Sequence, residues 1–146
     1  MIILFEKIYQ QIEHEGVAAF PNECCGVMIG RDEKQSDGAI NRIVESVQPL
    51  TNSFEADEQY HRFKLDPKEY IAVEKSAGEQ GKLVLGFYHS HPDHPAIPSE
   101  YDRSHAWPFY SYVIVSIMSR KPANMTSWLL DEATEKFIEE KVVRII

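Results

Sequence analysis

The sequence contains few of the features that would assign it to a special class of protein. It has only two cysteines among 146 residues, and they are neighbours, Cys24 and Cys25. Side chains adjacent on a strand point to opposite faces, so a disulfide between these two would need unusual geometry. We therefore expect two reduced thiols that pack in a strand, in a protein from a reducing compartment.

Long hydrophobic runs are also absent. No segment approaches the ~20 apolar residues that a membrane-spanning helix requires. The apolar start, residues 1–5, is short, contains no basic residue and is followed at once by Glu6, unlike a secretory signal peptide. No internal repeat or low-complexity block is present. We expect a cytoplasmic protein with a single domain that spans residues 1–146.

Basic residues are outnumbered, since 15 lysines and arginines stand against 23 aspartates and glutamates, for a net charge of -8. Nothing in this balance would attract a phosphate backbone, so we expect no nucleic-acid partner. Hydrophobic residues make up 43% of the chain and charged residues 26%. That mixture excludes a disordered tail, a collagen-like fibre and a membrane bundle.

Three helices are expected. The first is amphipathic, with Leu4, Ile8 and Ile12 at four-residue steps, and Pro21 closes its region. The second begins at Asp66-Pro67-Lys68-Glu69, where Asp66 can cap the helix and Glu69 can complete a capping box, and it ends near Gly78 or Gly81. The third is short, at residues 99–107, with Ser99 as its cap.

Strands alternate with these helices. Short apolar runs fall at 24–30, 40–47, 112–118 and 125–130 and, more ambiguously, at 137–146. In 82–91 both alternating sets of side chains are largely apolar, which is typical of a central strand. The polar segments 32–38 and 51–60 are expected to be a turn and a loop. We predict the fold class α/β, with a single mixed β-sheet flanked by helices.

The chemical signal is the pair His89 and His91, two residues apart on the expected 82–91 strand. Side chains at that spacing point to the same side, with Cα atoms ~6.6 Å apart, so both imidazoles can converge on one zinc ion. A proline-rich loop, residues 92–98, turns the chain back. Asp102, on the short helix beyond it, can supply a third ligand. Two histidines and one carboxylate leave a fourth position for water, as in catalytic zinc sites.

His89-Ser90-His91-Pro92, six further residues and Ser99-Glu100-Tyr101-Asp102 together resemble the motif of the JAMM, or MPN-plus, metalloisopeptidases. That motif is an upstream glutamate, then His-x-His-Pro, six residues and Ser-x-x-Asp. Glu23, between the first helix and a glycine-containing strand, matches the upstream glutamate. The resemblance covers most of the chain, up to the strand at Tyr112, and is closest to short bacterial members that consist of a bare catalytic domain.

The resemblance implies a JAMM/MPN fold of cytidine-deaminase-like architecture and one Zn²⁺ per chain, held by His89, His91 and Asp102. It implies that Glu23 takes a proton from the attacking water and returns it to the leaving amine. The Ser99 hydroxyl would stabilise the oxyanion. The implied substrate is a ubiquitin-like sulfur-carrier protein, from whose Gly-Gly tail an amino acid or peptide is removed. No inserted segment of the kind that grips ubiquitin chains is found in the sequence.

Other interpretations use the same residues. The run 89–94 also spells the His-x-His-x-Asp-His motif of metallo-β-lactamases, but that family needs further histidines downstream, and only His105 follows. Zinc deaminases need a Pro-Cys-x-x-Cys pair, which the sequence lacks, and a barrel amidohydrolase needs ~250 residues. The alternative that stays open is a catalytically inert MPN-type scaffold that binds protein, and zinc content would separate it from the enzyme.

Several further residues are given roles outside the motif. Asn52, in the polar loop, is a candidate for lining the cleft. Four histidines lack a set of partners and are assigned to the surface or the core: His14, His61, His94 and His105. Three aromatic residues are assigned to the core: Tyr110, Tyr112 and Trp128.

Overall fold

The computed structural model of this chain describes residues 1–60, 62 and 64–146. Its strands are β1 (Ile2–Phe5), β2 (Cys25–Lys34), β3 (Ile40–Leu50), β4 (Leu83–Pro92), β5 (Ser111–Met118), β6 (Lys121–Asp131), β7 (Lys136–Glu140) and β8 (Val142–Ile145). Its helices are α1 (Glu6–Ala19), α2 (Pro67–Glu79), the short α3 (Glu100–Ser104) and one 3-10 turn, η1 (Ala56–Glu58). Within the described part of the chain, no helix is both long enough and apolar enough to cross a membrane.

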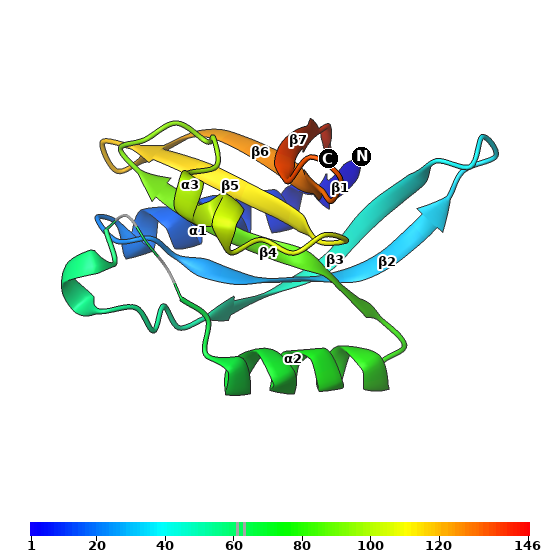
Figure 1. Ribbon diagram of the computed structural model, residues 1–146, viewed down its shortest axis with the longest axis horizontal. Coiled ribbons are helices and arrows are strands. Elements are labelled where there is room, and N and C mark those ends of the chain that lie inside the picture. The colour runs from blue at the N-terminus through cyan, green and yellow to red at the C-terminus, as the bar shows by residue number, and fades with distance from the viewer. Residues whose placement is uncertain (61, 63) are drawn as a thin grey trace.

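The strands form one eight-stranded sheet, in the order β7-β6-β5-β4-β2-β3-β1-β8. β4 runs parallel to β5, and β1 runs parallel to both β3 and β8, whereas the other neighbours are antiparallel. Figure 1 shows α1 and α2 on opposite sides of the strands. The predicted class, α/β with a single mixed sheet flanked by helices, is confirmed. β4 has a strand on either side, as its two apolar faces predicted.

The central strands supply two separate cores, because consecutive residues on a strand point to opposite faces. Tyr88 and Val113 belong to the larger core, which also contains Ile12 of α1. Their sequence neighbours Phe87 and Tyr112 belong to a smaller core that packs against side chains of α2. The smaller core is rich in aromatic residues, and it lies on the α2 side of the sheet.

The sheet curls around α1. This helix contacts β1, β3, β4, β5, β6 and β8. Only Lys141 separates β7 from β8, although these strands stand at the two ends of the strand order. The two edges of the sheet therefore meet at Lys141, and Figure 1 shows β7, β1 and both chain ends close together. The segment 137–146, whose apolar pairs fit no single period, is two short strands where one was predicted.

Three boundary predictions are wrong. The short helix expected at residues 99–107 is α3, which already ends at Ser104. Leu4 is a strand residue, not part of the first helix, because β1 pairs with β3 and β8 and buries Leu4 completely in the sheet. The segment 32–38 is not all turn. β2 extends to Lys34 and β3 begins at Ile40, so the two strands form a hairpin that Figure 1 shows projecting from the body.

The start and end of α2 follow the prediction, apart from one side chain. The Asp66 carboxylate accepts a hydrogen bond from the Lys68 N–H (2.9 Å), and Pro67 occupies the first helical position. Gly81, just beyond the last turn, adopts the left-handed φ of 71° that glycine tolerates. Glu69 does not complete a capping box, because its carboxylate instead accepts a hydrogen bond from the Thr51 N–H (3.2 Å).

Candidate metal centre

The two histidines lie on the central strand. His89 and His91 are two residues apart on β4, so their side chains share one face of the sheet. β4 is flanked by β2 and β5, where Cys25 and Ile114 pair with His89. His89 is consequently 1% exposed and His91 6% exposed. Buried imidazoles held by a sheet on both sides have few alternative rotamers.

Asp102 reaches the histidines from α3. The helix begins with a capping box, in which the Ser99 hydroxyl accepts from the Asp102 N–H (3.0 Å) and the Asp102 carboxylate accepts from the Ser99 N–H (2.9 Å). The carboxylate oxygen in this bond, Oδ2, is also the atom that faces both histidines. The cap therefore fixes the direction of the third candidate ligand.

Three donor atoms converge at this point. His89 Nε2 and His91 Nε2 are 3.1 Å apart, and Asp102 Oδ2 is 3.2 Å from the first and 3.1 Å from the second. Tetrahedral ligands at zinc distances of about 2.0–2.1 Å lie ~3.3 Å from one another. The set therefore fits a zinc ion. His91 Nδ1 lies 2.9 Å from the Pro95 carbonyl oxygen, an acceptor that keeps the proton on Nδ1 and leaves the Nε2 lone pair for a metal.

The charges within the group are strongly coupled. Burial favours the neutral acid, but the nearby His89 and the hydrogen bonds from both histidines and Ser99 outweigh it and hold the pKa of Asp102 far below its usual range. Burial opposes a charge on His89, but the Asp102 carboxylate overcomes that effect and raises the pKa of His89. Asp102 is consequently ionised at neutral pH and can bind a cation.

Glu23 lies beside this group, in the segment before β2. It is 5% exposed, and its main chain is tied down because its N–H donates to the Gln59 carbonyl (2.7 Å) and its carbonyl accepts from the Asn52 side chain (3.3 Å). Among the described residues, Glu23 Oε1 has no hydrogen-bond partner. Burial raises the pKa of Glu23 to about 8, with His89 opposing and Asp102 reinforcing the shift. A carboxyl group with these properties can exchange a proton near neutral pH.

Residues 5–131 match the Prok-JAB family, described as prokaryotic homologs of the JAB domain. The chain belongs to this family.

Relatives of the Prok-JAB chain include a desampylase from Haloferax volcanii, which is 37% identical over 123 residues that cover 83% of this chain and 81% of the relative. The solution structure of a protein from Desulfitobacterium hafniense matches with a TM-score of 0.80 and 34% identity, over 99% of this chain and 92% of that one. A JAB1/MPN domain protein from Archaeoglobus fulgidus, at 18% identity, matches over the full length of both chains with a TM-score of 0.61 and shares the fold.

Ser90 supports this Prok-JAB site, a role that the sequence pattern did not predict. It lies between the two histidines and is completely buried. Its hydroxyl accepts from the Cys24 N–H (2.8 Å), and its own N–H donates to the Cys24 carbonyl (3.2 Å). These bonds fix the Glu23 segment against β4. A small hydroxyl residue between two buried histidines on a central strand is the only sequence signal that could have indicated this role.

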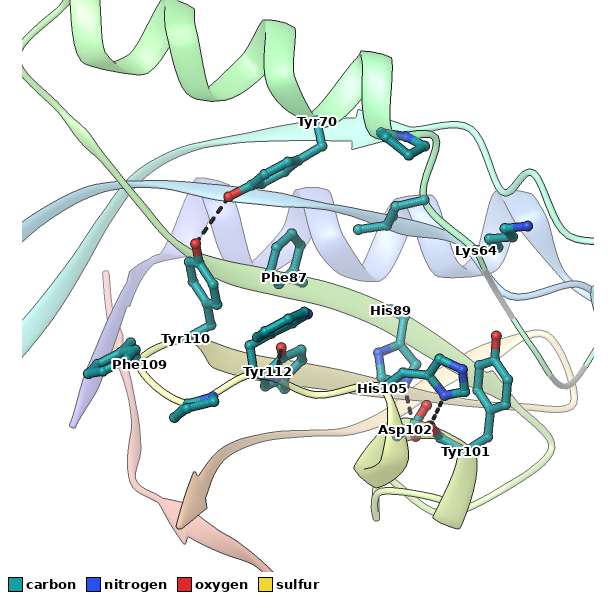
Figure 2. A pocket seen from close by; sticks show the side chains of 14 residues that line it. Lys64, Tyr70, Phe87, His89, Tyr101, Asp102, His105, Phe109, Tyr110 and Tyr112 are labelled. Carbon is teal, nitrogen blue, oxygen red and sulfur yellow. Dashed lines mark hydrogen bonds and ion pairs between the residues drawn. The ribbon is translucent and has the colours of Figure 1, made fainter. Parts of the chain in front are cut away.

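An aromatic pocket of about 720 Å³ adjoins the metal centre. His89 and Asp102 line one end of it, and Tyr70, Phe87 and Tyr112 line the rest (Figure 2). Residues of the smaller core therefore also form the wall of the cavity. Within this wall, Phe87 packs against the rings of Tyr70, Tyr110 and Tyr112. The sequence predicts core positions for Tyr110 and Tyr112, but both side chains also line this cavity.

The residues outside the motif lie in different places. His105 lines the aromatic pocket and stacks on Tyr101, with ring centroids 4.1 Å apart. His14 is exposed on α1, and His61 lies outside the described residues. Asn52 does not line the aromatic pocket, but its side chain connects the Glu23 and Arg62 carbonyls. Cys24 and Cys25 are free thiols and lie outside the one candidate metal group found among the described residues.

Proposed function

We propose that residues 1–146 form a single cytoplasmic catalytic domain, a zinc-dependent hydrolase that cleaves a peptide or isopeptide bond. We further propose that the bond follows the Gly-Gly tail of a ubiquitin-like sulfur-carrier protein. One observation carries the proposal: three buried donor atoms, of His89, His91 and Asp102, converge within 3.2 Å of one another beside the unpaired carboxyl oxygen of Glu23. The 37% identity to a desampylase supports isopeptide hydrolysis.

Each residue has a distinct task in this proposal. Zn²⁺ held by His89, His91 and Asp102 would supply Lewis acidity toward water and toward the substrate carbonyl oxygen. Glu23 takes a proton from the water while the water oxygen bonds to the carbonyl carbon of the substrate. Glu23 then returns that proton to the leaving nitrogen when the C–N bond breaks, which gives a carboxylic acid and an amine; at neutral pH the acid proton passes to the amine. The raised pKa of Glu23 suits a group that must both accept and donate a proton.

Ser99 is assigned the task of stabilising the oxyanion. Its hydroxyl oxygen accepts the Asp102 N–H, so the hydroxyl hydrogen can donate to a negatively charged oxygen that develops beside Asp102. The same side chain therefore serves as the helix cap and as an oxyanion donor. Ser99 is not assigned as a nucleophile, because the adjacent histidines are committed to the candidate metal site.

The decisive experiment combines zinc content with turnover. Zinc-loaded protein is incubated with carrier proteins conjugated through their Gly-Gly tails, and mass spectrometry follows release of the attached group. His89→Ala and Asp102→Ala should lose the zinc. Glu23→Gln should keep it and lose at least 100-fold in turnover, whereas Ser99→Ala should lose turnover but retain metal. His14→Ala, an exposed histidine on α1, is the matched control.

The alternative function is an inert MPN-type scaffold that binds protein. A wild-type chain that binds no zinc and cleaves no conjugate would favour it. Normal cleavage by Glu23→Gln would leave the hydrolase in place but refute the assigned base.

A further inference from the structure

Two aromatic side chains at the mouth of the aromatic pocket are exposed to an unusual degree. Trp107 and Phe109 lie between α3 and β5 and line the pocket, yet they are 68% and 79% exposed. The backbone of Phe109 adopts a left-handed φ of 81°, which is unfavourable for a residue with a side chain. Exposed apolar area and backbone strain both oppose folding. The exposed rings and the strained backbone of this loop therefore do not serve the stability of the protein.

The loop is nevertheless held firmly at the pocket. The Trp107 N–H donates to the Tyr112 hydroxyl on β5 (2.8 Å). The hydroxyls of Tyr110 and Tyr70 are 3.1 Å apart and connect the other end of the loop to α2. Figure 2 shows this tyrosine pair at the end of the pocket away from His89 and Asp102. The loop backbone is therefore positioned while its two large rings face solvent and the cavity.

The pocket has a defined place relative to the proposed reaction. His89 and Asp102 line it, whereas Glu23 does not. Because the leaving amine must meet Glu23 to receive its proton, the pocket is available to the acyl half of the substrate. Its volume of about 720 Å³ is that of a site for a whole small molecule, far more than two glycines occupy.

The lining also restricts which side chain suits the pocket. Apart from Asp102, the described lining residues include no carboxylate, whereas Lys64 and His105 both contribute to the wall. The rest is dominated by aromatic rings. A positively charged side chain of the substrate would be repelled by Lys64 and would find no carboxylate in the wall, apart from Asp102, to balance its charge. A large apolar side chain of the substrate would bury its surface against the aromatic rings.

We propose that Trp107 and Phe109 are specificity-determining residues, which hold a large apolar side chain of the acyl half of the substrate in the aromatic pocket. That side chain precedes the Gly-Gly pair. The inference rests on the proposed function, because Glu23 fixes which half of the substrate enters the pocket. It assigns the selection of substrates to a loop that contributes no candidate metal ligand.

The test measures binding separately from turnover. Four peptides that differ only in the residue X before a terminal Gly-Gly, with X as Leu, Phe, Ala or Lys, are titrated into the zinc-loaded protein by calorimetry. The Leu and Phe peptides should bind at least tenfold more tightly than the Ala and Lys peptides. In the double variant Trp107→Ala/Phe109→Ala the preference should fall below threefold. Ile40→Ala, which removes an apolar side chain that is 52% exposed at the start of β3, should keep the preference.

Melting temperature and zinc content establish that each variant is folded and loaded. Equal affinity for the four peptides, no measurable binding of any, or an unchanged preference in the double variant would overturn the inference. Cleavage of carrier conjugates by the same protein would then show that the hydrolase itself stands. Conversely, a clear apolar preference in a protein that cleaves no conjugate would contradict the proposed function alone.

Discussion

At the scale of single residues, the fold affects neighbouring groups of the site differently. It leaves the Glu23 carboxyl group able to exchange protons, and it suppresses the reactivity of the two adjacent thiols. Cys24 and Cys25 adjoin Glu23 but are shielded, since burial raises the pKa of Cys24 to about 12 and raises that of Cys25 as well. The thiolate is the reactive form. We expect iodoacetamide to alkylate both cysteines of the native protein at least 100-fold more slowly at pH 8 than those of the unfolded chain. The slow native rate should still be rising with pH above pH 9, where the rate of the unfolded chain has levelled off.

Mass spectrometry of protein treated with and without urea measures this difference. The unfolded chain should take up two adducts, at a rate that rises steeply with pH up to the ordinary thiol pKa of about 8.5. Rapid labelling of either cysteine in the folded protein would show that the segment containing Cys24 is open in solution.

The sequence predicts the role of a site residue where spacing along the chain alone determines the position of its side chain. His89 and His91 share a face because they are two apart on a strand, and Asp102 follows on the next helix. Ser90 and Tyr70 were not predictable in their roles, because each depends on a partner far along the chain. Ser90 meets Cys24 through the pairing of β4 with β2, and Tyr70 meets Tyr110 through the packing of α2 on the sheet.

At the scale of elements, the approach of β4 to β5 is set by a glycine. A Cβ added to Gly86 would lie 1.9 Å from the Ser111 carbonyl oxygen, closer than any real contact, where β4 pairs with β5. We expect Gly86→Ala to lower the free energy of unfolding by about 3 kcal/mol or more, because the backbone cannot move aside without breaking the ladder.

Gly78→Ala is the matched control for that prediction. Gly78 is an exposed residue of α2, and an added Cβ would meet no atom within 4 Å. This substitution should stabilise the protein by about 0.5–1 kcal/mol, because alanine is the better helix former. Urea denaturation followed by circular dichroism measures both. A Gly86→Ala protein as stable as the parent would mean that β4 and β5 can separate at no cost.

The wrong boundaries predicted for β1 and for the β2–β3 hairpin have the same cause. Leu4 fits a helical period with Ile8 and Ile12, yet it is in β1, because pairing with β3 and β8 buries it. The charged residues of the hairpin fit a turn, yet β2 continues through them because the ladder with β3 satisfies their backbone. Local pattern cannot reveal strand pairing between distant segments.

At the scale of the whole molecule, the candidate metal centre joins the central strand to the loop and helix that follow it. A ligand that binds only the folded state stabilises it, by about 4 kcal/mol when its free concentration is 1,000 times the dissociation constant. For a chain of 146 residues we therefore expect saturating zinc to raise the melting temperature by roughly 10 °C.

Differential scanning calorimetry with zinc and with a chelator measures the shift. Asp102→Ala should melt at the same temperature in both conditions. If the parent protein also showed no difference, the three convergent donor atoms would not be a zinc site.

The meeting of the two sheet edges at Lys141 has a consequence for synthesis. Ile2 is paired with Val142 and Leu4 with Arg144, so β1 cannot complete its pairing until β8, about 140 residues later in the chain, has been synthesised. Until then β1 has an open side, and the enclosure of α1 is incomplete. Such distant pairing slows folding, and a nascent chain arrested before residue 142 should expose the apolar side chains of β1 and α1 to chaperones.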